Sequence, residues 1–371
     1  MLEVGGSHLL QDDAENDATE DGVAPPAPAA SDRLSPSLSN GRKSKLILHV
    51  DLNETILASD EALSRRTVAS LDCFLATVTW GTVKHGKWEW LSDAPSLHPP
   101  CGGAVTYHSH HRQVHKFTSN AGKRFRGVLD EHLRLLRWPE GVKEDKELCM
   151  KAEDGHLYHW ILPSFFQLLQ DLVREGRDFA VVFRTFGVDL PRVLSALSRS
   201  VLEGAHPLFP DLPDLKEQLR VNPAQGKIRC SPKGVAVTRG EERVSSRDGD
   251  RSLYQYFSSA EGLGGFQDDY NWWTMNRSTG GKPLWVDPFD QDVQHIFLDD
   301  NIRLSDKDSV VNAKVFTDPG GSDTREASVP ELYDISLIQM DLLQAISDPH
   351  YFTKRIHICE ENYARNVQQV A

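Results

Sequence analysis

The sequence predicts an open α/β sheet whose strands run mainly parallel and are joined by right-handed helical crossovers. Two observations indicate this fold class. Continuous apolar runs without polar alternation recur along the chain, as in strands that are buried on both faces. Between them lie segments whose apolar residues recur every three or four positions, as in amphipathic helices.

Three predicted strands end in polar, potentially reactive residues. They span 45–50, 178–185 and 294–300, and a fourth apolar run covers 310–318. A helix is predicted at 162–178, with Gly176 as its stop, and another at 189–204, where Asp189 is a possible cap and Pro191 lies in the first turn. Two more helices are predicted at 329–346 and 350–370.

Two segments interrupt this alternation and divide the chain. Residues 59–159 are rich in aromatic and turn residues, and residues 205–281 are polar and lose clear periodicity. We expect both to be insertions into a core made of 44–58, 160–204 and 282–371. Residues 1–43 are acidic and rich in Pro, Ala and Ser, which is typical of a disordered tail rather than a basic leader.

Composition excludes several classes of protein. The net charge of -13 argues against binding the phosphate backbone of nucleic acids. The five cysteines form no CxxC pair, so we expect reduced thiols. No apolar stretch approaches the roughly 18 residues that a membrane span needs. We therefore expect a cytoplasmic protein without nucleic-acid or membrane partners.

The ends of the predicted strands carry the candidate chemistry. Asp51, Thr185, Asp299 and Asp300 follow or close the three runs, and ligands of open α/β sheets bind beyond the carboxyl ends of the strands. Carboxylates and a hydroxyl that meet there form a hard-oxygen site suited to Mg²⁺ and a phosphoryl group. An aspartate in such a site can attack phosphorus and form an aspartyl-phosphate.

Three motifs resemble those of the haloacid dehalogenase superfamily. LILHVDLNETI is similar to its first motif, an apolar strand followed by two aspartates one residue apart and a threonine; AVVFRT resembles the second motif, and HIFLDDN the fourth. This resemblance implies a Rossmann-like open parallel sheet with two cap-type insertions. It also implies a Mg²⁺-dependent phosphatase that hydrolyses a phosphate monoester on a phosphorylated small molecule or a phosphoprotein.

The resemblance also assigns roles to matching positions. Asp51 is the expected nucleophile and a metal ligand, Thr185 holds phosphoryl oxygens, and Asp299 and Asp300 bind or support Mg²⁺. A lysine should neutralise the phosphoryl group, and Lys282 is preferred over Lys227 and Lys233 because it lies shortly before the fourth motif. The residues expected to contact substrate are Asn53, Arg184 and Asn301.

Asn53 departs from the family pattern. Hydrolytic members usually carry an aspartate there, which protonates the leaving oxygen and then deprotonates water, and an amide does neither. The backbone carbonyl of Asn53 can still bind Mg²⁺. Loss of general acid and base catalysis costs about 10² to 10⁴ in rate. The alternatives are therefore a slow or catalytically idle domain that binds a ligand or a protein, and phosphotransfer to an acceptor other than water.

Two other clusters offer weaker signals. His108, His110, His111 and His115 invite a metal interpretation, but no carboxylate or cysteine completes a familiar spacing. A basic group at 116–126 is compatible with gripping an anionic substrate, and equally with a solvated loop. Neither GK pair has the glycine spacing of a nucleotide-binding loop.

Overall fold

The computed structural model describes residues 43–60, 63–111, 114, 116–276, 280–304 and 309–370, with only the backbone of 367–370. Lys43–Ala371 forms one compact unit. The predicted tail at 1–43 lies outside the described residues, apart from Lys43. None of the helices that the structure describes is both long and apolar enough to cross a membrane.

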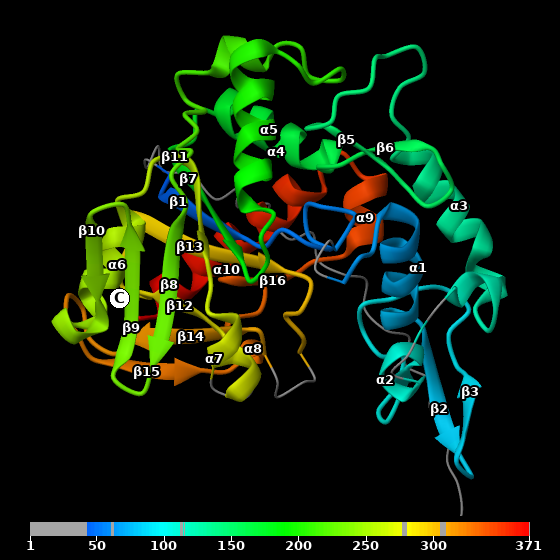
Figure 1. Ribbon diagram of the computed structural model, residues 1–371. Helices are drawn as coiled ribbons and strands as arrows, with labels where there is room; N and C mark the ends of the chain where they lie inside the picture. Colours follow the sequence, from blue (N-terminus) through cyan, green and yellow to red (C-terminus); the bar gives the residue numbers. More distant parts are fainter. Residues whose placement is uncertain are drawn as a thin grey trace, which may run out of the picture. The chain divides into compact units, whose positions relative to one another are not determined.

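The described residues form a main sheet of eight strands in the order β10-β9-β8-β11-β7-β1-β13-β16 (Figure 1). The strands from β11 to β16 are parallel, whereas β9 runs antiparallel to both β8 and β10. The predicted α/β class is confirmed, but the sheet is mixed rather than wholly parallel. These strands are β1 (Lys45–Val50), β7 (Phe179–Thr185), β8 (Gly226–Ser231), β9 (Gly234–Arg239), β10 (Glu242–Ser245), β11 (Gly262–Gln267), β13 (Val293–Asp299) and β16 (Leu337–Gln339).

The direction in which the chain builds this sheet reverses between β1 and β13. From β1 the chain adds β7 and β11 on one side, and later adds β13 and β16 on the other. At such a reversal the loops leave the sheet in opposite directions, and a crevice forms beyond the carboxyl ends of the two strands. The topology therefore places the expected ligand site beside Val50 and Asp299.

The two faces of β1 pack into different apolar layers, because successive side chains of a strand point to opposite sides. Leu46, Leu48 and Val50 belong to a core shared with the helices α4 (Pro163–Arg174), α5 (Leu190–Glu203), α9 (Leu342–Ser347) and α10 (Tyr351–Val370). Ile47 belongs to a second core, shared with α6 (Asp250–Ser258), β12 (Lys282–Val286) and β14 (Val311–Phe316). Both faces of the strand are buried, which explains its continuous apolar sequence.

A smaller sheet lies on the second face of the main sheet. It has the order β12-β14-β15 in the described chain, and its apolar residues pack against Phe297 of β13. The predicted strand at 310–318 therefore exists, but it belongs to this second sheet. Its strands are β12 (Lys282–Val286), β14 (Val311–Phe316) and β15 (Thr324–Ala327).

The predicted crossover helices are present as α4 and α5, and Pro163 and Pro191 lie in their first turns. Proline is compatible with this position because the first backbone N–H groups of a helix have no partner within it. The helices of the core and the 205–281 segment are α4 (Pro163–Arg174), α5 (Leu190–Glu203), η3 (Leu212–Leu215), η4 (Ser246–Asp248), α6 (Asp250–Ser258), α7 (Tyr270–Met275), α8 (Val329–Leu332), α9 (Leu342–Ser347) and α10 (Tyr351–Val370).

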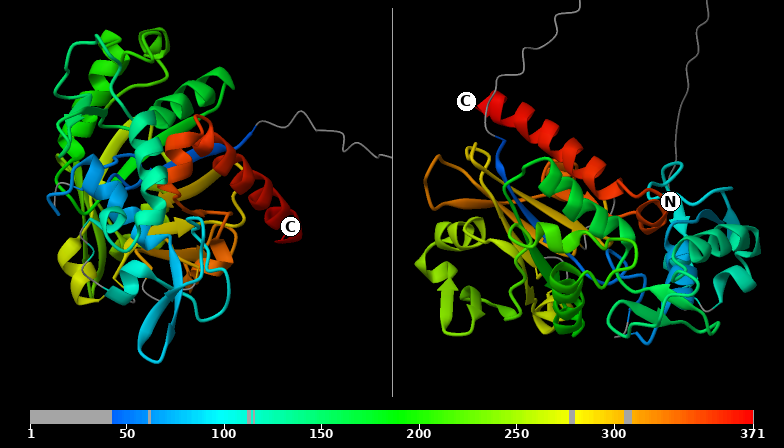
Figure 2. Two further views of the ribbon diagram at one scale, coloured as in Figure 1. Left: turned by 90° about the vertical axis from the view of Figure 1, so that its right-hand side faces the viewer. Right: turned by 90° about the horizontal axis from the view of Figure 1, so that it is seen from above.

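The described part of the segment 59–159 has two small β-sheets of its own, one of three strands and one of two, and also joins the main core. The hairpin of β2 and β3 projects away from the main sheet (Figures 1 and 2), whereas Phe74 and Phe125 belong to the same apolar core as α4. Its elements are α1 (Thr67–Thr77), β2 (Trp80–Lys84), β3 (Lys87–Trp90), β4 (Val105–Thr106), α2 (Tyr107–His111), η1 (Phe117–Ser119), η2 (Lys123–Phe125), α3 (Arg126–Leu135), β5 (Cys149–Lys151) and β6 (Leu157–His159).

Two predictions for the rest of the chain are wrong. The segment 205–281, expected as a separate insertion, supplies β8, β9, β10 and β11 to the main sheet, and β11 pairs along its whole length with β7. The region 329–346 is not one helix, because β16 separates α8 from α9 and forms the edge of the main sheet. A three-residue strand is too short to give a periodic signal.

Candidate active site

Three carboxylates meet at the carboxyl ends of β1 and β13. The two strands pair in register up to Val50 and Leu298, and the backbone N–H of Asp51 donates to the carbonyl of Leu298 at 3.0 Å. Asp51, Asp299 and Asp300 each offer an oxygen, and these oxygens lie within 4.8 Å of one another. The four predicted strand-end residues also line one pocket of about 610 Å³, here called the acidic pocket.

Lys282, the first residue of β12, reaches this cluster from the second sheet. Its Nζ donates to Asp51 Oδ1 at 2.6 Å, to Asp299 Oδ2 at 2.8 Å and to the carbonyl of Arg184 at 3.1 Å. The side chain is only 2% exposed. The alternative lysines, Lys227 and Lys233, are exposed. Lys282 is therefore the one of the three that lies beside Asp51.

Burial and like charges perturb the titration of this cluster. Burial raises the pKa of Asp51 to about 7, with a further contribution from Asp299, while Lys282 opposes the rise. The pKa of Asp300 is raised well above its ordinary value by burial and by Asp299. Burial alone would lower the pKa of Lys282, but the charges of Asp299 and Asp51 outweigh it and the pKa is raised.

Thr185 and the following loop form another wall of the acidic pocket. The hydroxyl of Thr185 accepts a hydrogen bond from the backbone N–H of Gly187 at 2.9 Å. A Cβ added to Gly187 would lie 3.3 Å from Thr185 Oγ1 and 3.3 Å from Asp189 Oδ2. A side chain at this position would therefore crowd the polar groups beside the acid cluster, and glycine leaves them accessible.

The amide of Asn53 is held by two acceptors. Its Nδ2 donates to Asp189 Oδ2 at 3.0 Å and to the carbonyl of Ser59 at 3.3 Å. Asp189 is buried, with 3% of its surface exposed. The sequence predicts Asp189 as a possible helix cap, but its side chain makes no capping bond to α5. Instead, it fixes the orientation of the residue that departs from the family pattern.

Asn301 and Arg184, both predicted to contact substrate, lie in different environments. Asn301 lines the acidic pocket, and its Nδ2 donates to Asp300 Oδ1 at 3.1 Å. Arg184 is fully buried and makes a double ion pair with Asp268, at 2.9 and 2.7 Å, on the face of β7 opposite to Thr185. Its predicted substrate contact is therefore corrected, because neighbouring strand residues face opposite sides.

Glu54 is a further residue of the site, to which the sequence motifs assign no role. The strand ends at Val50, and Glu54 adopts a left-handed backbone conformation with φ of 56°. This turn places Glu54 in the wall of the acidic pocket, where its carboxylate accepts from Ser70 Oγ at 3.0 Å. Burial raises the pKa of Glu54. The sequence does not reveal this conformation, because glutamate rarely adopts a positive φ.

The candidate histidine cluster does not form a metal site within the part of the chain that is described. There, the groups of carboxylate, histidine and cysteine ligands close enough to hold an ion comprise only Asp51, Asp299 and Asp300. His108 lines a neighbouring cavity, considered below. His115 lies outside the described residues.

No family model, curated protein or solved structure matches this chain. The functional interpretation therefore depends on the geometry of the acidic pocket and on the motifs that occupy it.

Proposed function

We propose that this protein belongs to the haloacid dehalogenase superfamily and transfers a phosphoryl group from a phosphate monoester to Asp51, and then to water. The observation that carries this proposal is the meeting of Asp51, Asp299 and Asp300 within 4.8 Å, with Lys282 bonded to two of them. Thr185 lines the same pocket. Each of these residues occupies a motif position whose role the family resemblance implies.

The donor set fits Mg²⁺. Three carboxylates from adjacent strand ends supply oxygen ligands, and Mg²⁺ prefers one or two carboxylates with waters and phosphate oxygens. The pKa values of Asp51 and Asp300 are raised because the two carboxyl groups are buried and lie close to other carboxylates. A divalent cation bound between them would reduce this charge repulsion. When bound, Mg²⁺ would withdraw charge from the phosphoryl oxygens. Asp51, Asp299 and the backbone carbonyl of Asn53 would hold it, with Asp300 as ligand or support.

The residues of the chain perform the remaining work. An oxygen of Asp51 attacks phosphorus, the bond from phosphorus to the leaving oxygen breaks, and the leaving oxygen departs with the electron pair. Lys282 and Thr185 stabilise the phosphoryl charge. Because the Asn53 amide carries no transferable proton, the leaving oxygen takes its proton from solvent. Esters with acidic leaving groups are therefore the preferred substrates. A water then attacks phosphorus, the bond from phosphorus to the Asp51 oxygen breaks, and the proton of the water passes to solvent. This hydrolysis is slow because Asn53 cannot act as a base.

We propose that 59–159 acts as the cap of this site. Asp60 and Leu63, at its beginning, line the acidic pocket together with Asp51. A segment in this position limits the access of water and shapes the space for the rest of the substrate. The substrate is a phosphorylated small molecule or a phosphoprotein, and the cytoplasmic location remains a prediction.

A second candidate function is a slow or idle domain that binds a phosphorylated ligand or a protein partner. Asn53 favours it, since its amide is already bonded to Asp189 and Ser59. The two functions differ in turnover, because a binding domain would release phosphate slowly or not at all. A product that forms only when a second acceptor is added would instead identify a phosphotransferase.

The experiment is phosphate release from acetyl phosphate, phenyl phosphate and a panel of phosphorylated metabolites, with and without Mg²⁺. The proposal predicts release that requires Mg²⁺ and is abolished by Asp51→Asn. Ligand binding without release would favour the second function. Release that persists in Asp51→Asn would rule out the aspartyl-phosphate mechanism.

A further inference from the structure

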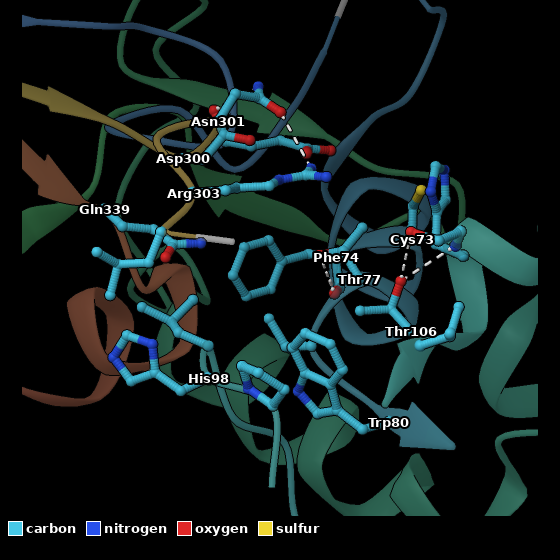
Figure 3. Close-up of a pocket in the computed structure, with 18 of the residues that line it drawn as sticks. Cys73, Phe74, Thr77, Trp80, His98, Thr106, Asp300, Asn301, Arg303 and Gln339 are labelled. Atoms are coloured by element: carbon cyan, nitrogen blue, oxygen red, sulfur yellow. Dashed lines mark hydrogen bonds between the residues drawn. The ribbon is translucent and has the colours of Figure 1, made fainter. Parts of the chain in front are cut away.

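A second cavity adjoins the acidic pocket. It has a volume of about 710 Å³ and shares five lining residues with the acidic pocket, among them Glu54, Asp300 and Asn301. We call it the side chamber (Figure 3). A phosphoryl group needs only the acidic pocket, whereas pockets of roughly 300–1,000 Å³ hold whole organic ligands. The side chamber is therefore large enough for the part of a substrate that is not transferred.

The end of the side chamber next to the acid cluster carries a cation. Nη2 of Arg303 donates to Asn301 Oδ1 at 3.2 Å, and Asn301 in turn bonds to Asp300. Among the described residues Arg303 forms no ion pair, whereas Arg65, another cation of the chamber, lies 3.8 Å from Glu54. A guanidinium has five N–H donors in a planar fork that matches a carboxylate or phosphate. Arg303 thus has donors left for an anionic ligand.

The imidazole of His108 lies in the same cavity and responds to these cations. Its pKa is lowered by burial first, and then by Arg303 and Arg65. His108 is therefore neutral near pH 7 and adds a polar group but no charge. This leaves Arg303 as the cation that an incoming anion would meet.

The lining of the side chamber also includes apolar side chains, those of Phe74, Val78, Trp80 and Leu97. In Figure 3 the ring of Phe74 lies between the Arg303 end and the end formed by Trp80 and His98. The indole Nε1 of Trp80 is already bonded to the carbonyl of Ser96 at 2.7 Å, so the ring offers a ligand apolar surface. A ring-sized apolar group fits this end by burying its surface there.

We infer that the side chamber binds the leaving group of the substrate, and that this group joins an apolar, ring-sized body to a second anion held by Arg303. The inference rests on the proposed function for the position of the phosphoryl group. It narrows the substrate class to phosphate monoesters of anionic, ring-containing alcohols or phenols. Unsubstituted alkyl phosphates lack both features.

Binding of non-hydrolysable probes tests the chamber separately from turnover. In the presence of Mg²⁺, calorimetry would compare 3-carboxybenzylphosphonate with its neutral counterpart, 3-carbamoylbenzylphosphonate. Wild-type protein should bind the carboxylate at least about tenfold more tightly, the effect of a charged hydrogen bond. Arg303→Gln should reduce this ratio to near one, and Arg303→Lys should give an intermediate ratio. Arg134→Gln, an exposed arginine of α3, should leave the ratio unchanged.

A second variant tests whether the probes occupy the side chamber. Ser109 is exposed on α2 and lines the chamber, so Ser109→Trp should occupy part of it and weaken both probes at least about tenfold relative to methylphosphonate. A ratio near one in wild-type protein, a ratio unaffected by Arg303→Gln, or no effect of Ser109→Trp would overturn the inference. If the probes bind as expected but no aryl phosphate is hydrolysed, the chamber stands and the phosphatase proposal fails.

Discussion

The ammonium group of Lys282 lies 2.6 Å from Oδ1 of Asp51, although the two residues are 231 positions apart in the chain. The same group is 2.8 Å from Asp299 Oδ2, and the Lys282 side chain is 2% exposed. Lys282, the first residue of β12, thus links the second sheet to the ends of two strands of the main sheet. Without it, two buried carboxylates would face each other unpaired.

Replacing Lys282 therefore affects both stability and chemistry. Lys282→Met should lower the free energy of unfolding by about 3–5 kcal/mol, the usual cost of removing one partner of a buried ion pair. Urea titration with and without Mg²⁺ measures this, and the cation should recover part of the loss. Lys227→Met, at an exposed lysine of β8, is the matched control. Equal stability of the two variants would contradict a charge-balancing role for Lys282.

Asn53 should make the rate depend strongly on the leaving group. Without a proton donor, wild-type protein should hydrolyse acetyl phosphate and phenyl phosphate much faster than glycerol 2-phosphate. Asn53→Asp should raise the rate with glycerol 2-phosphate by about 10²- to 10⁴-fold, because general acid catalysis matters most for poor leaving groups. Initial rates across the three substrates measure this dependence, and Asn53→Ala is the control.

The neighbour of residue 53 adds a second expectation. Because Asp189 Oδ2 lies 3.0 Å from the Asn53 amide, an aspartate at position 53 would share a proton with Asp189. The rate increase that Asn53→Asp gives with glycerol 2-phosphate should therefore move to lower pH when Asp189→Asn is added, because the new aspartate then loses its proton more easily. No gain with glycerol 2-phosphate would show that another group already supplies the proton.

Arg184 and Asp268 should contribute to folding rather than to substrate binding. Arg184→Met leaves Asp268 buried and unpaired, and should destabilise the fold by about 3–5 kcal/mol. The double variant Arg184→Met/Asp268→Leu should recover much of this loss, which a double-mutant cycle in urea would measure. The KM of the folded single variant for phenyl phosphate should stay near that of wild type. A large rise in KM would instead support the prediction that Arg184 contacts the substrate.

Two buried histidines should make the protein sensitive to acid. Burial lowers the pKa of His159 to about 4 and of His206 to about 3, the latter with a contribution from His159. Unfolded histidines titrate near 6.5, so the unfolded state binds more protons below that pH. The stability that these two histidines contribute is therefore fully present above about pH 6.5 and is lost on acidification. Each histidine should remove about 1.4 kcal/mol between pH 7.5 and pH 5.5.

The pH dependence of urea unfolding tests this expectation. His206→Phe keeps an aromatic ring beside Phe166 and should reduce the loss of stability between pH 7.5 and pH 5.5 by about 1.4 kcal/mol, the share of one histidine. Phe209→Leu perturbs the same aromatic cluster without a titrating group, and should keep the wild-type slope. Identical slopes for all three proteins would refute the assignment.

The sequence predicts those elements whose burial leaves a simple pattern. β1, β7 and β13 are buried on both faces and therefore read as apolar runs. β11 is missed because GLGGFQ resembles a loop. Its glycines have a packing reason, since a Cβ at Gly265 would lie 2.6 Å from Leu190 Cδ1 and 2.8 Å from Phe183 Cβ. Helix α5 and β7 approach this strand too closely for side chains.

The candidate site divides in the same way. Asp51, Asp299 and Asp300 follow apolar strands in sequence, so their convergence is predictable from topology. Lys282 is chosen by its proximity to the fourth motif, since its position in the second sheet has no sequence signal. Asp189 and Glu54 reach the site through loop conformations, which residue type does not reveal. The predicted substrate contact of Arg184 is wrong, because alternation along β7 turns its side chain to the face opposite to Thr185.

The most direct test of the central claim is a crystal soaked with Mn²⁺, as a substitute for Mg²⁺, together with beryllium fluoride, a mimic of the phosphoryl group. The account predicts an anomalous peak within ligand distance of Asp51 and Asp299, and beryllium bonded to an Asp51 oxygen within reach of Thr185 and Lys282. A manganese peak elsewhere, or beryllium fluoride bonded to a residue other than Asp51, would contradict this mechanism.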